Sequence, residues 1–90
     1  MYFVYMLFSE KLGKFYTGYS QDISSRLKQH NRGLVPFTAR GIPWELVYYG
    51  AFTYKEDALR EEKFLKTGKG RERRGYLLER YIQERRNKRS

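Results

Sequence analysis

Glu62 is a carboxylate in a predicted helix, at a position that helical geometry turns toward the protein interior. At about 100° per residue, Ala58, Leu59 and Leu65 define the apolar face of that helix, and Glu62 projects near the centre of this face. An unpaired carboxylate buried there costs several kcal/mol, so we expect it to meet a metal ion, another cation or water in a cleft. An internal salt bridge with an arginine is the alternative.

An earlier predicted helix repeats this pattern with a histidine and an arginine. Ile23 and Leu27 mark the apolar face of that helix, His30 falls on the same face, and Arg26 lies at its edge. Arg26 and His30 are four residues apart, so their head groups can converge. Each residue alone also has a structural interpretation, as a core histidine or as an arginine lying along an apolar surface. Together with Glu62 they predict a polar pocket between a sheet and its helices.

Such a pocket has the chemistry for phosphoryl transfer. A carboxylate can hold a hard cation such as Mg²⁺, and an arginine can bind the non-bridging oxygens of a phosphate. A base must also activate the attacking water. His30, with a reference pKa of about 6.5, can do so, whereas a tyrosine can do so only if cations lower its pKa of about 10. Tyr5 and Tyr16 lie on adjacent predicted strands, and ordinary core packing is the alternative for each.

The elements that position these residues can be read from apolar runs and end signals. Strands are predicted over 2–8, 15–19 and 44–52, and the first is apolar throughout, which is typical of a central strand. Gly18 inside the second strand indicates a bend or a close backbone approach. The order ββαβαα predicts an α+β fold, a small central antiparallel three-stranded sheet flanked by helices.

The helices have recognisable beginnings and ends. A helix over 22–31 begins at Asp22 as N-cap and is ended by Gly33. A second, over 54–67, begins with the capping box Thr53 to Glu56 and is stopped by glycines at 68 and 70, and a third spans about 72–86. Ninety residues predict one domain, 1–90, with a core over about 2–70 and a C-terminal helix over about 72–86.

The charge balance predicts a polyanionic partner. Lysine and arginine number 19 against 10 acidic residues, a formal charge of +9. Nucleic acid is the first expectation and an anionic membrane surface the second. The absence of cysteine excludes disulfides and thiolate metal sites and fits the cytoplasm, and no apolar run reaches the ~20 residues of a membrane span. Basic residues that flank the predicted pocket are expected to bind a phosphate backbone in a salt-sensitive way. They are Lys28, Arg32, Arg40, Lys66, Lys69 and Arg71.

Five motifs in order resemble the GIY-YIG nucleases over about 2–70. The naming pair is Phe3-Val4-Tyr5 followed eleven residues later by Tyr16-Thr17-Gly18. Three further segments follow it: a helix with Asp22-Ile23, Arg26-Leu27 and His30-Asn31, a strand from Pro43 to Tyr48, and a helix from Ala58 to Lys66. The chain is most similar to small stand-alone, single-domain members of the superfamily, which resemble the N-terminal domain of the bacterial excision-repair nuclease.

The resemblance implies a role for each site residue. Tyr5 and Tyr16 are the two motif tyrosines, one the general base and the other placing the water, with the assignment between them left open. Arg26 binds the scissile phosphate, and His30 assists proton transfer. Glu62 is the sole protein ligand of one Mg²⁺ or Mn²⁺ ion. Gly18 would let the backbone pack closely behind the site.

These roles imply a metal-dependent hydrolase, an endonuclease that binds and cuts DNA and belongs to DNA repair. The alternative is a non-catalytic nucleic-acid-binding module that retains the fold. One departure from the family pattern is that no asparagine stands near Arg74, about three turns after Glu62. The sequence leaves the oligomeric state open, and a homodimer is the expectation if both strands of a duplex are cut.

Overall fold

A three-stranded antiparallel sheet forms the centre of the computed structural model, which describes residues 1–89. The strand order is β2-β1-β3, so the apolar first strand is central, as predicted. The strands are β1 (Tyr2–Ser9), β2 (Lys14–Ser20) and β3 (Trp44–Phe52). Gly13, with a φ of 63°, makes the turn between β1 and β2, and β2 is left as an edge strand. The predicted α+β class is confirmed.

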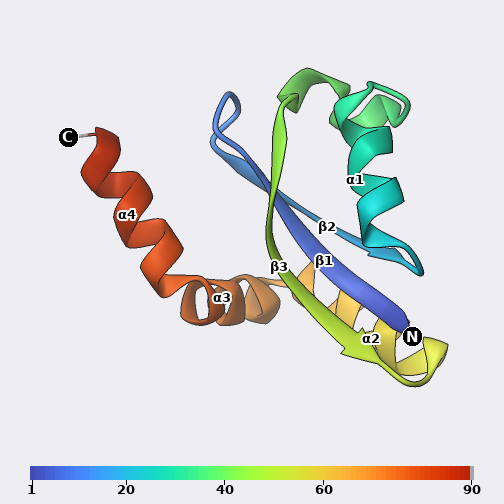
Figure 1. Cartoon of the computed structure of the whole chain (residues 1–90). Coiled ribbons are helices and arrows are strands. Elements are labelled where there is room, and N and C mark those ends of the chain that lie inside the picture. The colour runs from blue at the N-terminus through green and yellow to red at the C-terminus, as the bar shows by residue number, and fades with distance from the viewer. Residues whose placement is uncertain (90) are drawn as a thin grey trace.

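Each face of the sheet carries a helix (Figure 1). Helix α1 (Ile23–Asn31) lies on one face, where it packs near Tyr5 and Leu7, and α2 (Lys55–Leu65) lies on the other, over Val4 and Met6. Successive side chains of a strand point to opposite faces. The alternation along β1 therefore divides the core into two apolar clusters, with the tyrosine on the α1 side.

The predicted single helix over 72–86 is wrong. The chain instead forms α3 (Gly68–Leu77) and α4 (Glu79–Arg89), because it leaves helical geometry at Leu78, whose side chain is buried in the core cluster under α2. The glycines at 68 and 70 also do not simply end a helix. Thr67 caps α3 by accepting a hydrogen bond from the Gly70 N–H at 3.1 Å. A β-carbon at Gly70 would lie 2.1 Å from the Phe64 carbonyl oxygen, so this tight connection requires glycine.

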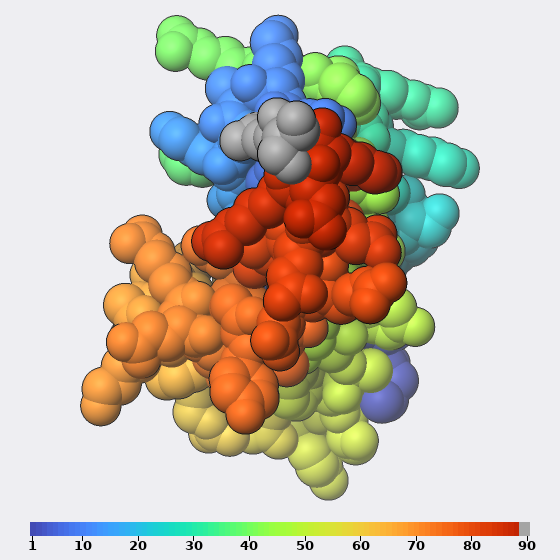
Figure 2. All heavy atoms as spheres, turned by 90° about the vertical axis from the view of Figure 1, so that its left-hand side faces the viewer, coloured from blue at the N-terminus to red at the C-terminus, as the bar shows by residue number. Residues whose placement is uncertain are grey.

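Helix α4 is tied back to the sheet by polar contacts. Arg85 donates to Glu10 at 3.0 Å and to Glu45 at 2.9 Å, and the Tyr81 hydroxyl donates to Glu45 at 2.6 Å. Figure 2 shows α4 in red and α3 in orange covering much of one face of the molecule. Ser90, the last residue of the predicted domain, lies outside the described residues.

Two other helix signals have different outcomes. Asp22 is the N-cap of α1 and accepts from the Ser25 N–H at 3.0 Å, as predicted. The capping box at Thr53 does not form, since Tyr54 is the N-cap of α2 and makes no side-chain capping bond. A short 3-10 helix, η1 (Pro36–Gly41), lies between α1 and β3. Within residues 1–89 no helix has the length and hydrophobicity needed to cross a bilayer.

Candidate active site at the edge of the sheet

A buried hydrogen-bonded chain links Tyr5, His30 and Thr38. The Tyr5 hydroxyl lies 2.9 Å from His30 Nε2, and His30 Nδ1 lies 2.7 Å from Thr38 Oγ1. The Thr38 hydroxyl donates to the Val35 carbonyl at 3.3 Å, so it accepts from His30. The network therefore assigns the Nδ1–H tautomer to His30, which leaves Nε2 to accept the proton of Tyr5. His30 is 0 % exposed and Tyr5 is 1 % exposed.

Thr38 is held in place by contacts that sequence reasoning missed. The Trp44 indole N–H donates to the Thr38 carbonyl at 2.7 Å. The Asn31 side chain, at the end of α1, accepts from the Trp44 N–H at 2.6 Å and donates to its carbonyl at 3.0 Å. These contacts fasten η1 to α1 and β3. A threonine in a loop without periodicity gives no sequence signal of such a role.

Gly18 supports Tyr5 from β2. The two residues are directly opposite in the β1–β2 register. A β-carbon on Gly18 would lie 2.4 Å from the Tyr5 hydroxyl oxygen and 2.5 Å from Cζ. A close approach to the Gly18 backbone was expected, and it is the Tyr5 ring that makes it, by lying across β2 at this position.

Tyr16 lies on the same face of the sheet, because it pairs with Leu7 two residues beyond Tyr5. Its ring centroid is 6.4 Å from that of Tyr5 and 5.0 Å from that of His30. Tyr16 is half-buried rather than enclosed. Of the two phenols, Tyr16 is therefore the one that can meet a molecule from solvent.

Arg26 supplies the positive charge of this cluster. It is half-buried on α1, and its Nη1 donates to Gln29 at 2.8 Å. Burial lowers the pKa of His30, and the Arg26 charge lowers it further. Burial raises the pKa of Tyr5, the charges of Tyr16 and Glu62 act in the same direction, and Arg26 opposes them. Burial dominates, so Tyr5 does not have the lowered pKa that a tyrosine base needs.

Glu62 lies on α2, beside the buried face and not at its centre. Leu59 is 40 % exposed, whereas Ala58 and Leu65 are buried, so the face is rotated from its predicted position. At 100° per residue, Glu62 lies about 50° to one side of the Ala58–Leu65 line and Glu61 about 50° to the other. The Glu62 side chain is 22 % exposed and accepts from Lys66 at 3.2 Å. Its negative charge contributes, after burial, to raising the pKa of Tyr5.

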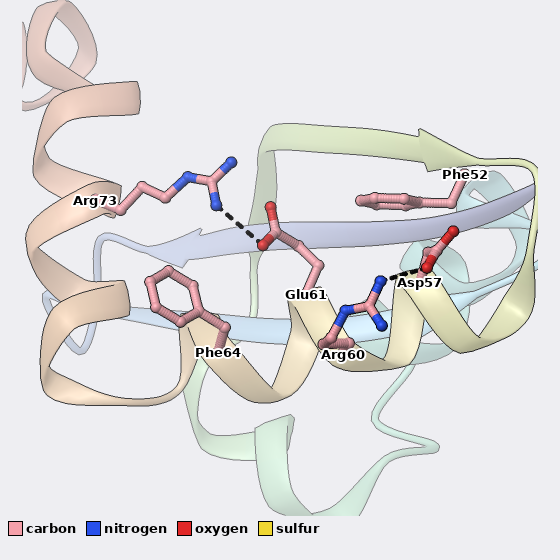
Figure 3. Close-up of a pocket in the computed structure, with 6 residues that line it drawn as sticks. All are labelled: Phe52, Asp57, Arg60, Glu61, Phe64 and Arg73. Atoms are coloured by element: carbon pink, nitrogen blue, oxygen red, sulfur yellow. Dashed lines mark hydrogen bonds and ion pairs between the residues drawn. The ribbon is translucent and has the colours of Figure 1, made fainter.

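Glu61, the adjacent glutamate, forms the internal salt bridge with an arginine that was the alternative for Glu62. Glu61 accepts from Arg73 of α3 at 3.1 Å. Figure 3 shows this pair beside Phe64, with the Asp57–Arg60 pair farther along α2. The two neighbouring carboxylates thus lie at opposite edges of the buried face of α2, Glu61 paired with Arg73 and Glu62 with Lys66.

An open groove of about 350 Å³ runs over the edge strand beside Tyr16. Aromatic and basic side chains line most of it: Phe15, Tyr16, Phe37, Lys66, Arg71 and Arg74. Of the predicted nucleic-acid-binding residues, Lys66 and Arg71 lie here. The other basic residues among them, Lys28, Arg32, Arg40 and Lys69, do not line this groove.

The donor set suits a single hard cation. Residues 1–89 contain no group of three His, Cys, Asp or Glu side chains close enough to hold a metal. His30 already uses both ring nitrogens, toward Tyr5 and Thr38. Glu62 remains as a half-buried carboxylate whose hydrogen-bond partner is a lysine. Proteins commonly bind Mg²⁺ through one or two carboxylates, with substrate phosphates and several waters completing the shell.

Known proteins resemble this chain over most of its length. The model of the GIY-YIG catalytic domain matches residues 1–77. A UPF0213 protein of Staphylococcus epidermidis is 41 % identical over 56 residues, which are 61 % of this chain and 68 % of the relative. One of Lacticaseibacillus paracasei is 39 % identical over 62 residues, 68 % of each chain. The solution NMR structure of a UPF0213 protein from Bacillus halodurans has a TM-score of 0.52 and 36 % identity, and covers 86 % of this chain and 85 % of that one. The chain therefore belongs to the GIY-YIG catalytic domain family, a family of nuclease domains that act on nucleic acid.

Proposed function

We propose that this chain is a metal-dependent endonuclease that hydrolyses phosphodiester bonds in DNA with one divalent cation. One observation carries the proposal: the buried Tyr5–His30 hydrogen bond lies on the face of the sheet that also carries Tyr16 and Arg26. Glu62 of α2 supplies a carboxylate whose negative charge contributes to raising the pKa of Tyr5. Phosphodiester hydrolysis needs positive charge at the phosphate and a path for the proton of the attacking water. These residue types provide both.

Arg26 binds the phosphate in this proposal. Its guanidinium is half-buried and donates to the neutral amide of Gln29, so a phosphate oxygen is a stronger partner. The planar guanidinium can bind two non-bridging oxygens at once. Binding there brings the phosphorus atom to the side of the sheet on which both phenols lie.

Tyr16, Tyr5 and His30 move the proton. The hydroxyl of Tyr16, the more accessible phenol, orients the water. As the water oxygen forms its bond to phosphorus and the bond to the leaving oxygen breaks, the water proton passes to the Tyr16 hydroxyl, the Tyr16 proton passes to Tyr5, and Tyr5 gives its own proton to His30 Nε2. The lowered pKa of His30 keeps the ring neutral near pH 7, so Nε2 is available as the acceptor. Thr38 holds that tautomer.

Glu62 is the residue that would hold the cation, Mg²⁺ or Mn²⁺. When bound, such an ion neutralises charge that develops on the phosphate and the leaving oxygen. Lys66 must release the carboxylate first. That ion pair is largely exposed on the lysine side, and exposed pairs contribute at most about 1 kcal/mol, so release is inexpensive.

A non-catalytic nucleic-acid-binding module is the second candidate. The raised pKa of Tyr5 favours it, since burial opposes ionisation of one of the two phenols. This candidate keeps the basic groove but needs no cation at Glu62.

Nicking of supercoiled plasmid in Mg²⁺ or Mn²⁺ tests the proposal. Loss of several kcal/mol of charge stabilisation predicts that Glu62→Ala is about 10²- to 10³-fold slower than wild type. Tyr16→Phe is also expected to be slower, whereas the matched control Glu61→Ala keeps wild-type activity because its carboxylate pairs with Arg73. Equal nicking by wild type and Glu62→Ala would overturn the nuclease assignment. Binding without cleavage would favour the second candidate.

A further inference from the structure

Phe37 is a large apolar side chain left in solvent beside the candidate active site. It is 85 % exposed and belongs to η1, next to the anchored Thr38. Its ring centroid is 6.0 Å from that of Tyr16, with the planes tilted by 50°. An isolated exposed phenylalanine needs no explanation. Phe37, however, belongs to η1, which is anchored by the Trp44–Thr38 hydrogen bond, and it lines the groove that contains Tyr16.

The other wall of that groove is positively charged. It is formed by Lys66 at the end of α2 and by Arg71 and Arg74 of α3, and no carboxylate lines the groove. Within residues 1–89, neither Arg71 nor Arg74 has a carboxylate within 4.0 Å. The Arg74 guanidinium lies 4.4 Å from the centroid of the Phe15 ring. Burial lowers the pKa of Arg74, and the positive charge of Arg71 lowers it further. Two arginines that line one groove without an acidic partner favour an anion.

Resting on the nuclease function proposed above, we propose that Phe37 stacks on an unpaired base beside the scissile phosphate, while Arg71 and Arg74 bind backbone phosphates of the same strand. Aromatic stacking and cations along one groove are the two elements of single-strand binding. Inside a duplex, neighbouring bases cover both faces of each base. A substrate that uses Phe37 must therefore be single-stranded or contain an unpaired or displaced base, which defines the substrate class.

Tyr16 connects this groove to the chemistry. Its side chain lines the groove and its ring is 5.0 Å, centroid to centroid, from His30. A strand held between Phe37 and the two arginines passes the Tyr16 phenol. Stacking would therefore position the phosphate and add affinity without reading sequence.

Binding measured in EDTA separates this inference from catalysis. The probes are a fluorescein-labelled single strand of about twelve dT nucleotides, enough to fill one such groove, and the same strand with abasic residues, which keep every phosphate. Phe37→Ala should bind the dT strand about 5- to 150-fold more weakly than wild type, the cost of one base–aromatic stack. The abasic strand should bind both proteins equally. Phe37→Trp should restore binding to the dT strand. The tryptophan fluorescence of this variant should be quenched when unlabelled dT is added.

Tyr76→Ala is the matched control. Tyr76 is 86 % exposed on α3 and does not line the groove, so this variant should bind both strands as wild type does. Equal dT affinity for Phe37→Ala and wild type would overturn the inference, as would equal loss on both strands. Phe37-dependent binding to anionic lipid vesicles, without such binding to dT, would do the same. Phe37-dependent binding without metal-dependent cleavage would leave the stacking intact and sink only the nuclease function.

Discussion

Replacing Gly18 with alanine tests how firmly the Tyr5 phenol is positioned. The added β-carbon would lie 2.4 Å from the Tyr5 hydroxyl oxygen and 2.5 Å from Cζ, well inside van der Waals contact. The ring cannot move away cheaply, because it is 1 % exposed and its hydroxyl is hydrogen-bonded to His30. Strand propensity acts in the other direction, since alanine in a strand is favoured over glycine by about 0.5–1 kcal/mol.

The magnitude follows from two costs. Overpacking a filled core costs about 1–3 kcal/mol, and loss of the Tyr5–His30 hydrogen bond costs about 0.5–1.5 kcal/mol. Less the propensity gain, Gly18→Ala should lower the free energy of unfolding by about 0.5–4 kcal/mol. A displacement near 1 Å at a reacting group can cost about 10²-fold in rate, so cleavage should fall strongly as well.

Urea unfolding followed by circular dichroism measures the stability change, with Gly75→Ala as the control. A β-carbon at Gly75 meets nothing within 4 Å, and this residue lies inside α3, so alanine there should stabilise the protein by about 0.5–1 kcal/mol. If Gly18→Ala were as stable and as active as Gly75→Ala, the phenol would not be pinned as described.

The buried network and the basic groove give three further predictions. Thr38→Val leaves the His30 Nδ1–H without its acceptor and should lower the free energy of unfolding, measured in urea, by about 1–3 kcal/mol. Thr38→Ser should restore it. Unchanged stability in Thr38→Val would refute the assigned tautomer. Because the pKa of His30 is lowered by folding, the unfolded chain binds more protons below about pH 6.5, so stability should fall as the pH drops through that value. Urea unfolding should show a smaller fall for His30→Gln, and an equal fall would count against a neutral buried ring. Arg71→Ala should reduce by about 1 the slope of the logarithm of the DNA-binding constant against the logarithm of the salt concentration. The control Arg80→Ala, in an exposed ion pair on α4, should leave this slope unchanged. Equal slopes for the two variants would count against a phosphate contact at Arg71.

Much of the fold could be predicted from local sequence signals. The continuous apolar run of β1 identified the central strand, and Asp22 identified the start of α1, because burial on both faces and N-capping are local properties. The end of α2 was predicted to within two residues, but the glycines at 68 and 70, which were expected only to stop it, belong to α3. Gly70 permits a close approach of α3 to the Phe64 carbonyl at the end of α2. A glycine in the sequence does not by itself reveal such a contact.

The candidate site was predictable residue by residue but not as a network. Periodicity placed His30 on a buried face, and the structure places it at 0 % exposed. Thr38 and Phe37 were not predicted, because both lie in the short helix η1, whose position depends on the hydrogen bond from the Trp44 indole to the Thr38 carbonyl. Periodicity predicted that Glu62 lies near the centre of the buried face of α2, whereas in the structure it lies at the border of that face. The error came from counting Leu59 as core, since an apolar residue type does not determine burial.

The most direct test of the account is to measure Mn²⁺ binding and DNA cleavage on the same samples of wild type and Glu62→Gln. The amide keeps the shape of the side chain but removes the charge that would hold the cation. We expect wild type to bind one Mn²⁺ and to cleave, and Glu62→Gln to lose Mn²⁺ binding and to cleave about 10²- to 10³-fold more slowly. Unchanged Mn²⁺ affinity together with unchanged cleavage in Glu62→Gln would contradict the claim that this carboxylate holds the catalytic cation.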